Sequence, residues 1–557
     1  MLLKDQRVKR PSKTKLFQRG SDKYVYHIEK TYKKDSIKHL AEKRVCIGKM
    51  VDSEYLIPNE KFEKYYPGVV INKETVTPEF SDSVDVGTFS LIDSFMKSTS
   101  IGDILDETFD SDSSLIKDLI SYILIKESCV FEHFPYWARK SVIYSNKIYS
   151  DSSISKLLKD NISIKQIEYF LNEWNKLNTD INDVYINVDS TNFNVTSDYD
   201  GLADYGYAKD DKDKLQINLS YLSRADNNRP LSYDLYNGSI NDTGEIIHLL
   251  NVFNKYNYSN IGFIFDRGYY SLDLVKYLKK KGYFFIMMLK DNYDYVQDLI
   301  DKHKDELVSS IDNYISEYEL SYVSKKVNIS KSKTEKVYCY VHLFYNAYKA
   351  ANDKIVLLNT VDTYEKEINT IYKTNKLATS ESFTKYNKYF NFHYSKEGYL
   401  SSFEKNKTAI KNAISSLGYF AILTSKQVDS KEVISTYRSR DSIEKLFRAL
   451  KTSFEFDHPG VHYKSSLESK VFITFLAMIL RNEISITLSG LNINDRKQYT
   501  FPYIINELNA IEASKHINNI YSRRYALTAK QKKILSIYKL KEKDIEATIS
   551  LLNTKIQ

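Results

Sequence analysis

The chain of 557 residues is predicted to fold as an α/β protein around one mixed sheet flanked by helices. Three strand-like segments, 184–193, 215–223 and 231–238, follow one another closely, as in an antiparallel meander. Two short apolar runs, 261–265 and 283–289, then alternate with helical stretches, as the buried strands of a layered sheet do. The resulting order β-β-β-α-β-α-β favours a mixed sheet covered by helices.

The first part of the chain is basic. Residues 1–49 contain 15 Lys and Arg against 5 Asp and Glu, whereas the net charge of the whole chain is +8. Within the N-terminal segment 1–87, residues 24–32 and 43–50 alternate in a strand-like way around a polar turn, which predicts a small basic β-hairpin. Localised positive charge is typical of surfaces that contact phosphates, although many basic termini are only solubilising.

A small helical domain is expected over residues 88–176, because apolar residues recur at helical spacing in segments such as 115–127. The first part of the sheet region then covers residues 177–290. Its second part covers residues 411–465, where the apolar strand 418–425 returns to the sheet and leads into a helix.

The segment between these two parts, residues 291–410, is polar and rich in Lys and Tyr. Two apolar runs within it, 337–345 and 354–361, resemble strands. We therefore expect an inserted β-rich subdomain here, without a function that can be derived from its residues.

The C-terminal region 466–557 is expected to be mainly helical. Its mainly apolar run 471–480 has ten residues, about half of a membrane span, and predicts a buried helix rather than a transmembrane one. The first ten residues contain no apolar stretch of the kind found in secretory signals, so we expect no membrane association and a cytoplasmic protein. Three distant cysteines argue against a disulfide framework or a zinc site.

Two aspartates stand where mixed sheets often place active-site acids. Asp189 follows the apolar residues 184–188, and Asp266 ends the run 261–265. An aspartate at the end of a strand is often only a turn-former. If the two strands are neighbours, however, the carboxylates lie side by side, and their repulsion calls for a cation such as Mg²⁺.

A polar stripe is predicted on the helix that follows the returning strand. Because a helix advances 100° per residue, four polar residues fall within about 60° of one another: Tyr437, Arg440, Glu444 and Lys451. The apolar strip beside them, expected to pack on a core, consists of Ile443, Leu446, Phe447 and Leu450. A charged stripe is most often a solvated face. Next to the two aspartates, the glutamate would instead be a third metal ligand, and its neighbours would grip phosphates.

Together, these residues resemble a known family. Asp189, the motif 266-DRG-268 and the spacing Tyr437-x2-Arg440-x3-Glu444-x6-Lys451 are similar to those of the bacterial DDE transposases of the insertion-sequence-four group, of which the last pattern is the defining signature. The segments 206–212 and 230–243 resemble the family's connection between its first and second Asp. The resemblance covers roughly residues 180–480.

The resemblance implies a metal-dependent transposase with a ribonuclease H-like core, interrupted before its Glu-bearing helix by the inserted subdomain. It implies that Asp189, Asp266 and Glu444 are catalytic and hold two Mg²⁺ ions, which Mn²⁺ can replace. The implied reaction is hydrolysis at the 3′ ends of the element, followed by attack of the freed 3′-OH on target DNA. The implied partners are double-stranded DNA, at terminal inverted repeats and at the target, and a second copy of the chain in a homodimer on two paired ends.

DNA contacts are expected in two places. On the signature helix the resemblance implies contacts through Tyr437, Arg440 and Lys451, and upstream of the sheet we expect a DNA-binding role for the helical domain 88–176 and the basic segment before it. Two alternatives stay open: a domesticated DNA-binding protein without catalysis, and a ribonuclease H-like nuclease that cuts without joining. Retention of all three acids favours the active transposase, and inverted repeats flanking the gene would distinguish it from the nuclease.

Overall fold

The computed structural model describes most of the chain. The described residues are 6–20, 22–32, 41–51, 53–69, 72–73, 80–178, 184–206, 213–240, 242–256, 258, 260–332, 334–374, 379–441, 447–448, 450–451, 454, 456, 459–492 and 499–556.

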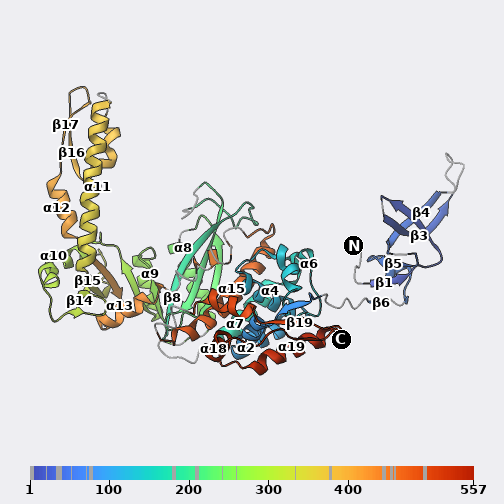
Figure 1. Ribbon diagram of the computed structural model, residues 1–557. Coiled ribbons are helices and arrows are strands. Elements are labelled where there is room, and N and C mark those ends of the chain that lie inside the picture. The colour runs from blue at the N-terminus through green and yellow to red at the C-terminus, as the bar shows by residue number, and fades with distance from the viewer. Residues whose placement is uncertain are drawn as a thin grey trace.

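The largest sheet among the described residues is mixed and has nine strands, and it lies to the left of the helical body in Figure 1. From one edge to the other its strands are β10 (Pro230–Asn237), β9 (Gln216–Arg224), β8 (Tyr185–Asn194), β11 (Gly262–Phe265), β12 (Phe284–Leu289), β18 (Tyr419–Thr424), β15 (Tyr338–Tyr345), β14 (Leu320–Asn328) and β13 (Tyr314–Ile315). Strands β8, β9 and β10 form an antiparallel meander, β11 is parallel to both β8 and β12, and β18 is antiparallel to β12. The predicted α/β class, the meander and the returning strand are confirmed.

Helices cover both faces of this sheet. One face packs on α8 (Asp242–Phe253), α9 (Leu272–Lys281) and α10 (Asp294–Val308) through apolar side chains such as Leu250, Leu278 and Ile300. The 3₁₀ turn η4 (Asn254–Tyr256) follows α8. The other face packs on α13 (Ser430–Arg438) through Val433 and Ile434. Alternate side chains of the central strands therefore enter two different layers.

The segment 291–410 differs from the prediction. Strands β13, β14 and β15 extend the main sheet instead of forming a separate β-rich subdomain. The strand predicted at 354–361 is wrong, because these residues lie within the long helix α11 (Ala347–Thr374). The apolar side chains of α11 recur every three or four residues on one face: Leu357, Val361, Tyr364, Ile368 and Ile371. This helical period outweighs the short apolar run on which the strand prediction rested.

An arm projects from the sheet beyond β15 (Figure 1). It consists of α11 packed on the antiparallel pair β16 (Phe390–Tyr394) and β17 (Leu400–Lys405), with the 3₁₀ turn η5 (Ser380–Tyr386) between them. The helix α12 (Lys407–Ser415) leads back to β18. The chain thus leaves the sheet after one strand and re-enters it at a strand hydrogen-bonded to that one.

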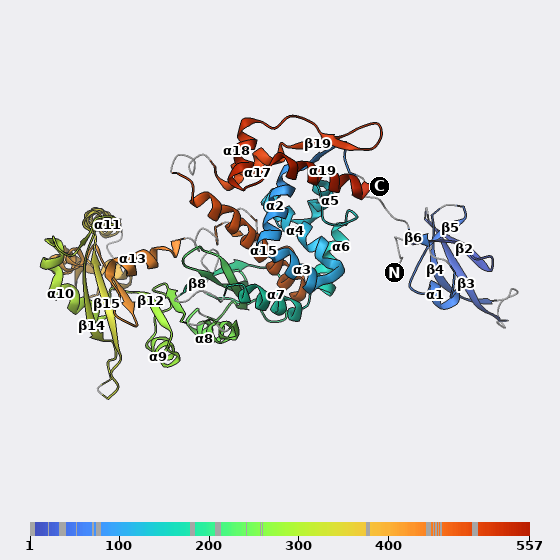
Figure 2. The same cartoon turned by 90° about the horizontal axis from the view of Figure 1, so that it is seen from below.

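The helices before and after the sheet share one core, which joins two regions predicted to be separate (Figure 2). The first set is α2 (Gly87–Ser98), α3 (Ile101–Phe109), η1 (Asp110–Asp112), α4 (Ser113–Lys126), η2 (Phe131–His133), α5 (Phe134–Ala138), α6 (Asp151–Lys156), η3 (Leu157–Asn161) and α7 (Ile164–Lys176). The second set is α15 (Lys464–Ser489), α17 (Phe501–Asn509), α18 (Ala529–Ile537) and α19 (Glu542–Ile556). The small strands β7 (Ser83–Asp85), β19 (Glu512–Lys515) and β20 (Tyr521–Arg523) pair across the same two regions.

Helix α15 is the centre of this helical body. It is long and apolar enough to cross a membrane, but 72% of its most apolar window is buried within the protein. Its side chains Phe472 and Phe475 contact rings of α3, α7 and the central sheet. Over the described residues the apolar character of α15 is that of a core helix, as predicted for residues 471–480.

The N-terminal segment forms a six-stranded antiparallel sheet that lies to one side of the rest (Figure 2). Its strands are, in order, β2 (Thr14–Arg19), β3 (Asp22–Tyr32), β4 (Ala41–Met50), β5 (Tyr55–Pro58), β1 (Gln6–Lys9) and β6 (Asn72–Lys73), with the single turn of helix α1 (Phe62–Tyr65). Val25, Ile47 and Phe62 belong to its own small core. The predicted hairpin is confirmed as β3 and β4, within a larger sheet.

Candidate active site

Asp189 lies in the middle of β8, the first strand of the meander, and not at the end of a strand as its place after the apolar run suggested. The side chains of Ile186 and Val188 enter the layer of α8 and α9, so Asp189 points to the opposite face, toward α13. The residue is only 8% exposed, and its Oδ1 atom accepts a hydrogen bond of 2.9 Å from the backbone N–H of Ser190. The strand therefore holds this carboxylate in a nearly buried position.

Asp266 follows the last residue of β11 on the neighbouring strand. Strands β8 and β11 are parallel, with Phe263 opposite Ile186 and Ile264 opposite Asn187. Continuing this register by two residues places Asp266 opposite Asp189, on the same face of the sheet. The Asp266 Oδ1 atom accepts a hydrogen bond of 2.7 Å from the backbone N–H of Arg267. The neighbouring strands on which the two-aspartate prediction depended are thus present.

Arg440 lies between these two carboxylates. Its Nη2 atom is 2.9 Å from Oδ2 of Asp189 and 3.6 Å from Oδ2 of Asp266. Burial disfavours the charged guanidinium, but the two carboxylates outweigh burial and raise the pKa of Arg440. The arginine is therefore a fixed positive charge shared by both acids.

Tyr437 lies on the same side of the site, one helical turn earlier in α13. Its hydroxyl donates a long hydrogen bond of 3.4 Å to Oδ1 of Asp266 and lies 3.5 Å from Sδ of Met288 on β12. Burial raises the pKa of this hydroxyl, with Arg440 opposing the effect and Asp266 adding to it. Tyr437 therefore stays protonated and remains a hydrogen-bond donor beside the second aspartate.

The prediction of one continuous helix from Tyr437 to Lys451 is wrong, because a turn interrupts the helix after Arg438. Helix α13 ends at Arg438, and the N–H groups of Ser439 and Arg440 bond three residues back, to Thr436 and Tyr437. The hydroxyl of Ser439 also donates to the Thr436 carbonyl at 2.7 Å, which competes with the regular helical ladder. This tight turn directs Arg440 at the carboxylates rather than along one continuous stripe.

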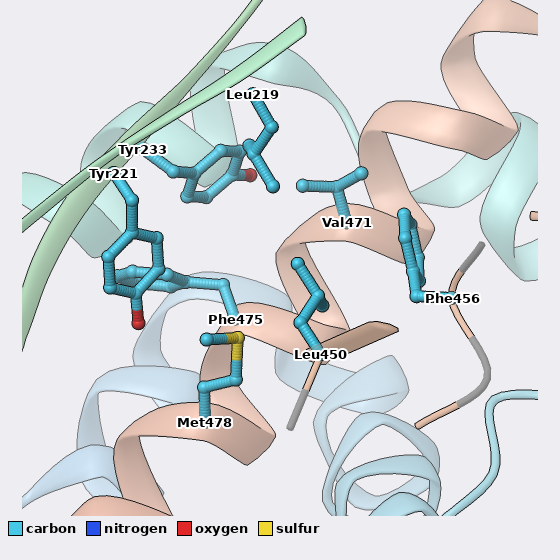
Figure 3. A pocket seen from close by; sticks show the side chains of 8 residues that line it. All are labelled: Leu219, Tyr221, Tyr233, Leu450, Phe456, Val471, Phe475 and Met478. Atoms are coloured by element: carbon cyan, nitrogen blue, oxygen red, sulfur yellow. The ribbon is translucent and has the colours of Figure 1, made fainter. Parts of the chain in front are cut away.

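Three residues of the predicted helix lie outside the described residues: Ile443 and Leu446 of the apolar strip and Glu444 of the polar stripe. Glu444 as the third carboxylate therefore stays a prediction. Phe447 and Leu450 are buried, as predicted, and Figure 3 shows Leu450 among side chains of the strands β9 and β10 and of α15, such as Tyr221 and Phe475. The space they enclose is only about 10 Å³, so this junction is packed core rather than a binding site. Lys451, next in sequence, is half-buried.

Asn187 is a polar residue of the site region that the sequence patterns do not predict. It lies two residues before Asp189 on the same face of β8 and is fully buried, yet neither its amide oxygen nor its amide nitrogen has a hydrogen-bond partner within the described structure. Opposite it on β9, the buried hydroxyl of Ser223 is in the same condition. The available signal was a lone amide inside the apolar run 184–188, because a polar group in a buried strand normally has a hydrogen-bond partner.

Comparison with known proteins assigns the family. A family model described as a transposase DDE domain matches residues 183–480, which is more than half of the chain and includes both aspartates and the turn at Arg440. The chain belongs to the DDE transposases. The match also covers the range over which the sequence resembles that family. A search of curated proteins finds no match.

Among solved structures, this transposase is similar to one in a cryo-EM structure described as the piggyBac transposase synaptic complex with hairpin DNA. The two chains are 9% identical, and the similarity covers 83% of this chain and 72% of the other, with a TM-score of 0.31. At that score the similarity carries no further argument.

The donor set of the site fits divalent metal ions, whose use the DDE family implies. Asp189 and Asp266 offer carboxylate oxygens from adjacent strands, which are the ligands that Mg²⁺ prefers. The Nη2 atom of Arg440 already occupies a point close to both carboxylates, so the structure itself shows where positive charge is favourable. The two aspartates can therefore share a cation, whether it is a guanidinium or a metal ion.

Proposed function

We propose that this transposase cuts DNA at the ends of a mobile element of the insertion-sequence-four group and joins the freed 3′ ends to target DNA, in a cut-and-paste reaction. The observation that carries the proposal is the placement of Asp189 and Asp266 on adjacent parallel strands, around one shared positive charge, within the segment matched by the family. The Tyr437-to-Lys451 spacing supports the choice of group.

The proposal includes a ribonuclease H-like core. Its support is the order of strands: a three-stranded antiparallel meander whose first strand, β8, is followed on its other side by β11 and β12, both parallel to it. Helices α8 and α9 connect these strands on one face. The first acid then lies on the first strand of the meander and the second acid follows the adjacent parallel strand.

Asp189, Asp266 and Glu444 would hold two Mg²⁺ ions, which Mn²⁺ can replace. When bound, such ions polarise the scissile phosphate and lower the pKa of the attacking water or 3′-OH. The sheet contributes the rigidity that this chemistry needs, because Asp189 is fixed in the middle of a strand and Asp266 by the backbone N–H of Arg267. No covalent enzyme intermediate is part of the proposed reaction.

Arg440 would have two roles. Without substrate it neutralises the repulsion between Asp189 and Asp266, since it contacts both carboxylates. When cations of higher charge take that position, the guanidinium is free to pair with a DNA phosphate, to which its donors are suited. Lys451 would contact a flanking phosphate, and the protonated hydroxyl of Tyr437 would donate a hydrogen bond beside the cut.

The proposed partner is double-stranded DNA, at the terminal inverted repeats and at the target site. The basic six-stranded sheet at the N-terminus and the helical domain 88–176 would recognise the ends. A homodimer would hold two paired ends, and the protein would act in the cytoplasm of a bacterium.

The experiment that tests this function uses the full chain and labelled duplexes with the inverted repeats that flank the gene, in Mg²⁺. The proposal expects 3′-end cleavage and covalent joining of the cut end to a target plasmid. Cleavage without joining would instead identify a nuclease. Binding without cleavage would identify a catalytically silent DNA-binding protein.

A further inference from the structure

A second group of potential metal ligands lies away from the two aspartates. It consists of Asp234 in the middle of β10, at the edge of the sheet, and of Glu245 and His248 on α8. Residues three positions apart lie on the same face of a helix, so Glu245 and His248 face the strand together. This grouping of an edge strand and a helix is absent from the family signature.

The three side chains converge closely enough to share an ion. One potential ligand atom from each side chain lies within 4.8 Å of the others, and Nε2 of His248 is 3.9 Å from Oδ2 of Asp234. In a tetrahedral zinc site with bonds of about 2.0–2.1 Å, ligand atoms are about 3.4 Å apart. A side-chain adjustment of about 1 Å would close that difference, and the largely exposed His248 is free to make it.

Glu245 supplies independent evidence for a ligand. It is only 8% exposed, and its Oε1 atom is buried without a hydrogen-bond partner in the described part of the structure. A buried carboxylate oxygen without a partner is costly, since it has lost its hydration. Burial raises the pKa of Glu245 to about 7, and the charge of the neighbouring Asp234 and a side-chain hydrogen bond shared with it add to this effect. A cation between Glu245 and Asp234 would compensate for the lost hydration and would offset the repulsion between the two carboxylates.

The group lies on the opposite face of the sheet from Asp189. Asp189 is opposite Tyr221 on β9, which is opposite Tyr233 on β10, and these cross-strand neighbours share a face. Tyr233 contacts Phe475 of α15 on that face, so the next residue, Asp234, points to the other side. An ion held there could not be one of those at the catalytic aspartates.

We propose that Asp234, Glu245 and His248 form a second cation site, which binds a divalent transition-metal ion, with Zn²⁺ as the best-fitting ion. Two carboxylates and one imidazole suit Zn²⁺ and related ions, whereas Mg²⁺ prefers oxygen ligands throughout. The bound ion ties α8 to the edge strand β10 and thereby fixes the outer part of the meander that carries Asp189. The proposal does not depend on the proposed reaction.

The test uses Co²⁺ as a spectroscopic probe for the full chain, with Mg²⁺ in excess to occupy the catalytic carboxylates. The proposal predicts that each chain binds one Co²⁺ ion, that the bound ion absorbs visible light as a low-coordinate ion does, and that Zn²⁺ displaces it. Loss of one ligand in His248→Ala or Glu245→Gln should weaken Co²⁺ binding at least about 10-fold. The matched control is His303→Ala, which removes a histidine that contacts only Glu306 among carboxylates of the described residues, and it should bind Co²⁺ as the parent does.

The combined variant Asp189→Ala/Asp266→Ala identifies the location of the ion. The proposal expects it to keep the Co²⁺ signal, and loss of the signal would place the ion at the catalytic aspartates and overturn the proposal. Unchanged Co²⁺ affinity in both His248→Ala and Glu245→Gln would also overturn it, as would the absence of Co²⁺ and Zn²⁺ binding by the parent. Circular dichroism confirms that each variant is folded.

Discussion

The Nη2 atom of Arg440 lies 2.9 Å from Oδ2 of Asp189, although 251 residues separate the two in the chain. The same nitrogen is 3.6 Å from Oδ2 of Asp266. A basic residue of the proposed signature is thus an ion-pair partner of the two acids. This relationship makes Arg440 a structural element of the site as well as a candidate phosphate contact.

Replacement of Arg440 should destabilise the protein when no metal is available. Arg440→Gln leaves two carboxylates facing each other, and we expect a loss of about 2–3 kcal/mol in the free energy of unfolding in EDTA. Mg²⁺ should restore part of this loss, because it replaces the missing positive charge. Denaturant titrations with and without Mg²⁺ measure both effects.

The matched control is Arg438→Ala. Arg438 is exposed and stacks on the ring of Tyr318, so its loss should cost no more than about 1 kcal/mol and should not respond to Mg²⁺. An equal loss for both variants, or an effect of Arg440→Gln that Mg²⁺ does not change, would contradict the role given to Arg440.

Replacements of Glu444 and of Lys451, which follow the turn at Arg440, should impair different steps of the reaction. Glu444→Gln keeps the shape of the side chain but removes the charge proposed to bind metal, so this variant should bind element ends and not cut them. Lys451→Ala removes a proposed phosphate contact and should weaken binding, lowering the slope of log K against log salt by about 0.9. Gel-shift titrations beside a cleavage assay across a Mg²⁺ series separate the two defects, and normal cutting by Glu444→Gln would exclude it as a ligand.

The N-terminal sheet should supply much of the salt-dependent affinity for DNA. We expect alanine at four exposed basic positions to lower the salt slope by up to about 4, because each lost phosphate contact contributes about 0.9. These positions are Lys13, Arg19, Lys23 and Lys30. The charge-matched control replaces four exposed lysines near the C-terminus, Lys530, Lys532, Lys539 and Lys543. Equal changes in the two variants would show that charge rather than position decides binding.

Glu245 should make the stability of the metal-free protein depend on pH. Its pKa is raised from the usual value of 4.5 to about 7, so the native state holds its proton more tightly than the unfolded state. The contribution of Glu245 to the free energy of unfolding is therefore fully present below about pH 4.5 and is lost as pH rises through 7. Glu245→Gln removes this loss, and at pH 8 in EDTA it should be more stable than the parent by about 2 kcal/mol. Thermal unfolding at pH 4.5 and pH 8 tests this, and equal differences at both values would contradict it.

The sequence predicts the centre of the fold well because its signals there are local. The apolar runs before Asp189 and Asp266 lie in buried strands, and the proximity of the two aspartates follows from one parallel pairing. The contact between Arg440 and these acids was not predictable from a helical wheel, since the turn at Ser439 interrupts the helix on which the wheel depends. The aspartates were thus accessible to sequence reasoning, and the partner of Asp189 was not.

Long-range packing explains the other differences. Trp174 of α7 and Ile479 of α15 belong to one core, although their segments lie on either side of the sheet region in the chain. The composition of α7 does not indicate that it packs with α15, and the composition of α15 does not indicate that it packs with α7. A fragment that ends at residue 176 would expose that core, so DNA binding by the helical domain is better tested in the full chain.

The central claim is that Asp189 and Asp266 together hold the catalytic metal, and cleavage of one labelled element end in Mg²⁺ tests it most directly. The comparison includes Asp189→Ala, Asp266→Ala and a control, Asp291→Ala. Asp291 follows β12 much as Asp266 follows β11, but it is exposed. A gel shift on the same DNA reports binding.

We expect each of the first two variants to bind the end and to lose detectable cleavage, because carboxylates hold the metal while basic residues hold DNA. Asp291→Ala should cut and bind like the parent. Normal cleavage by Asp189→Ala or Asp266→Ala, with intact binding, would contradict the account.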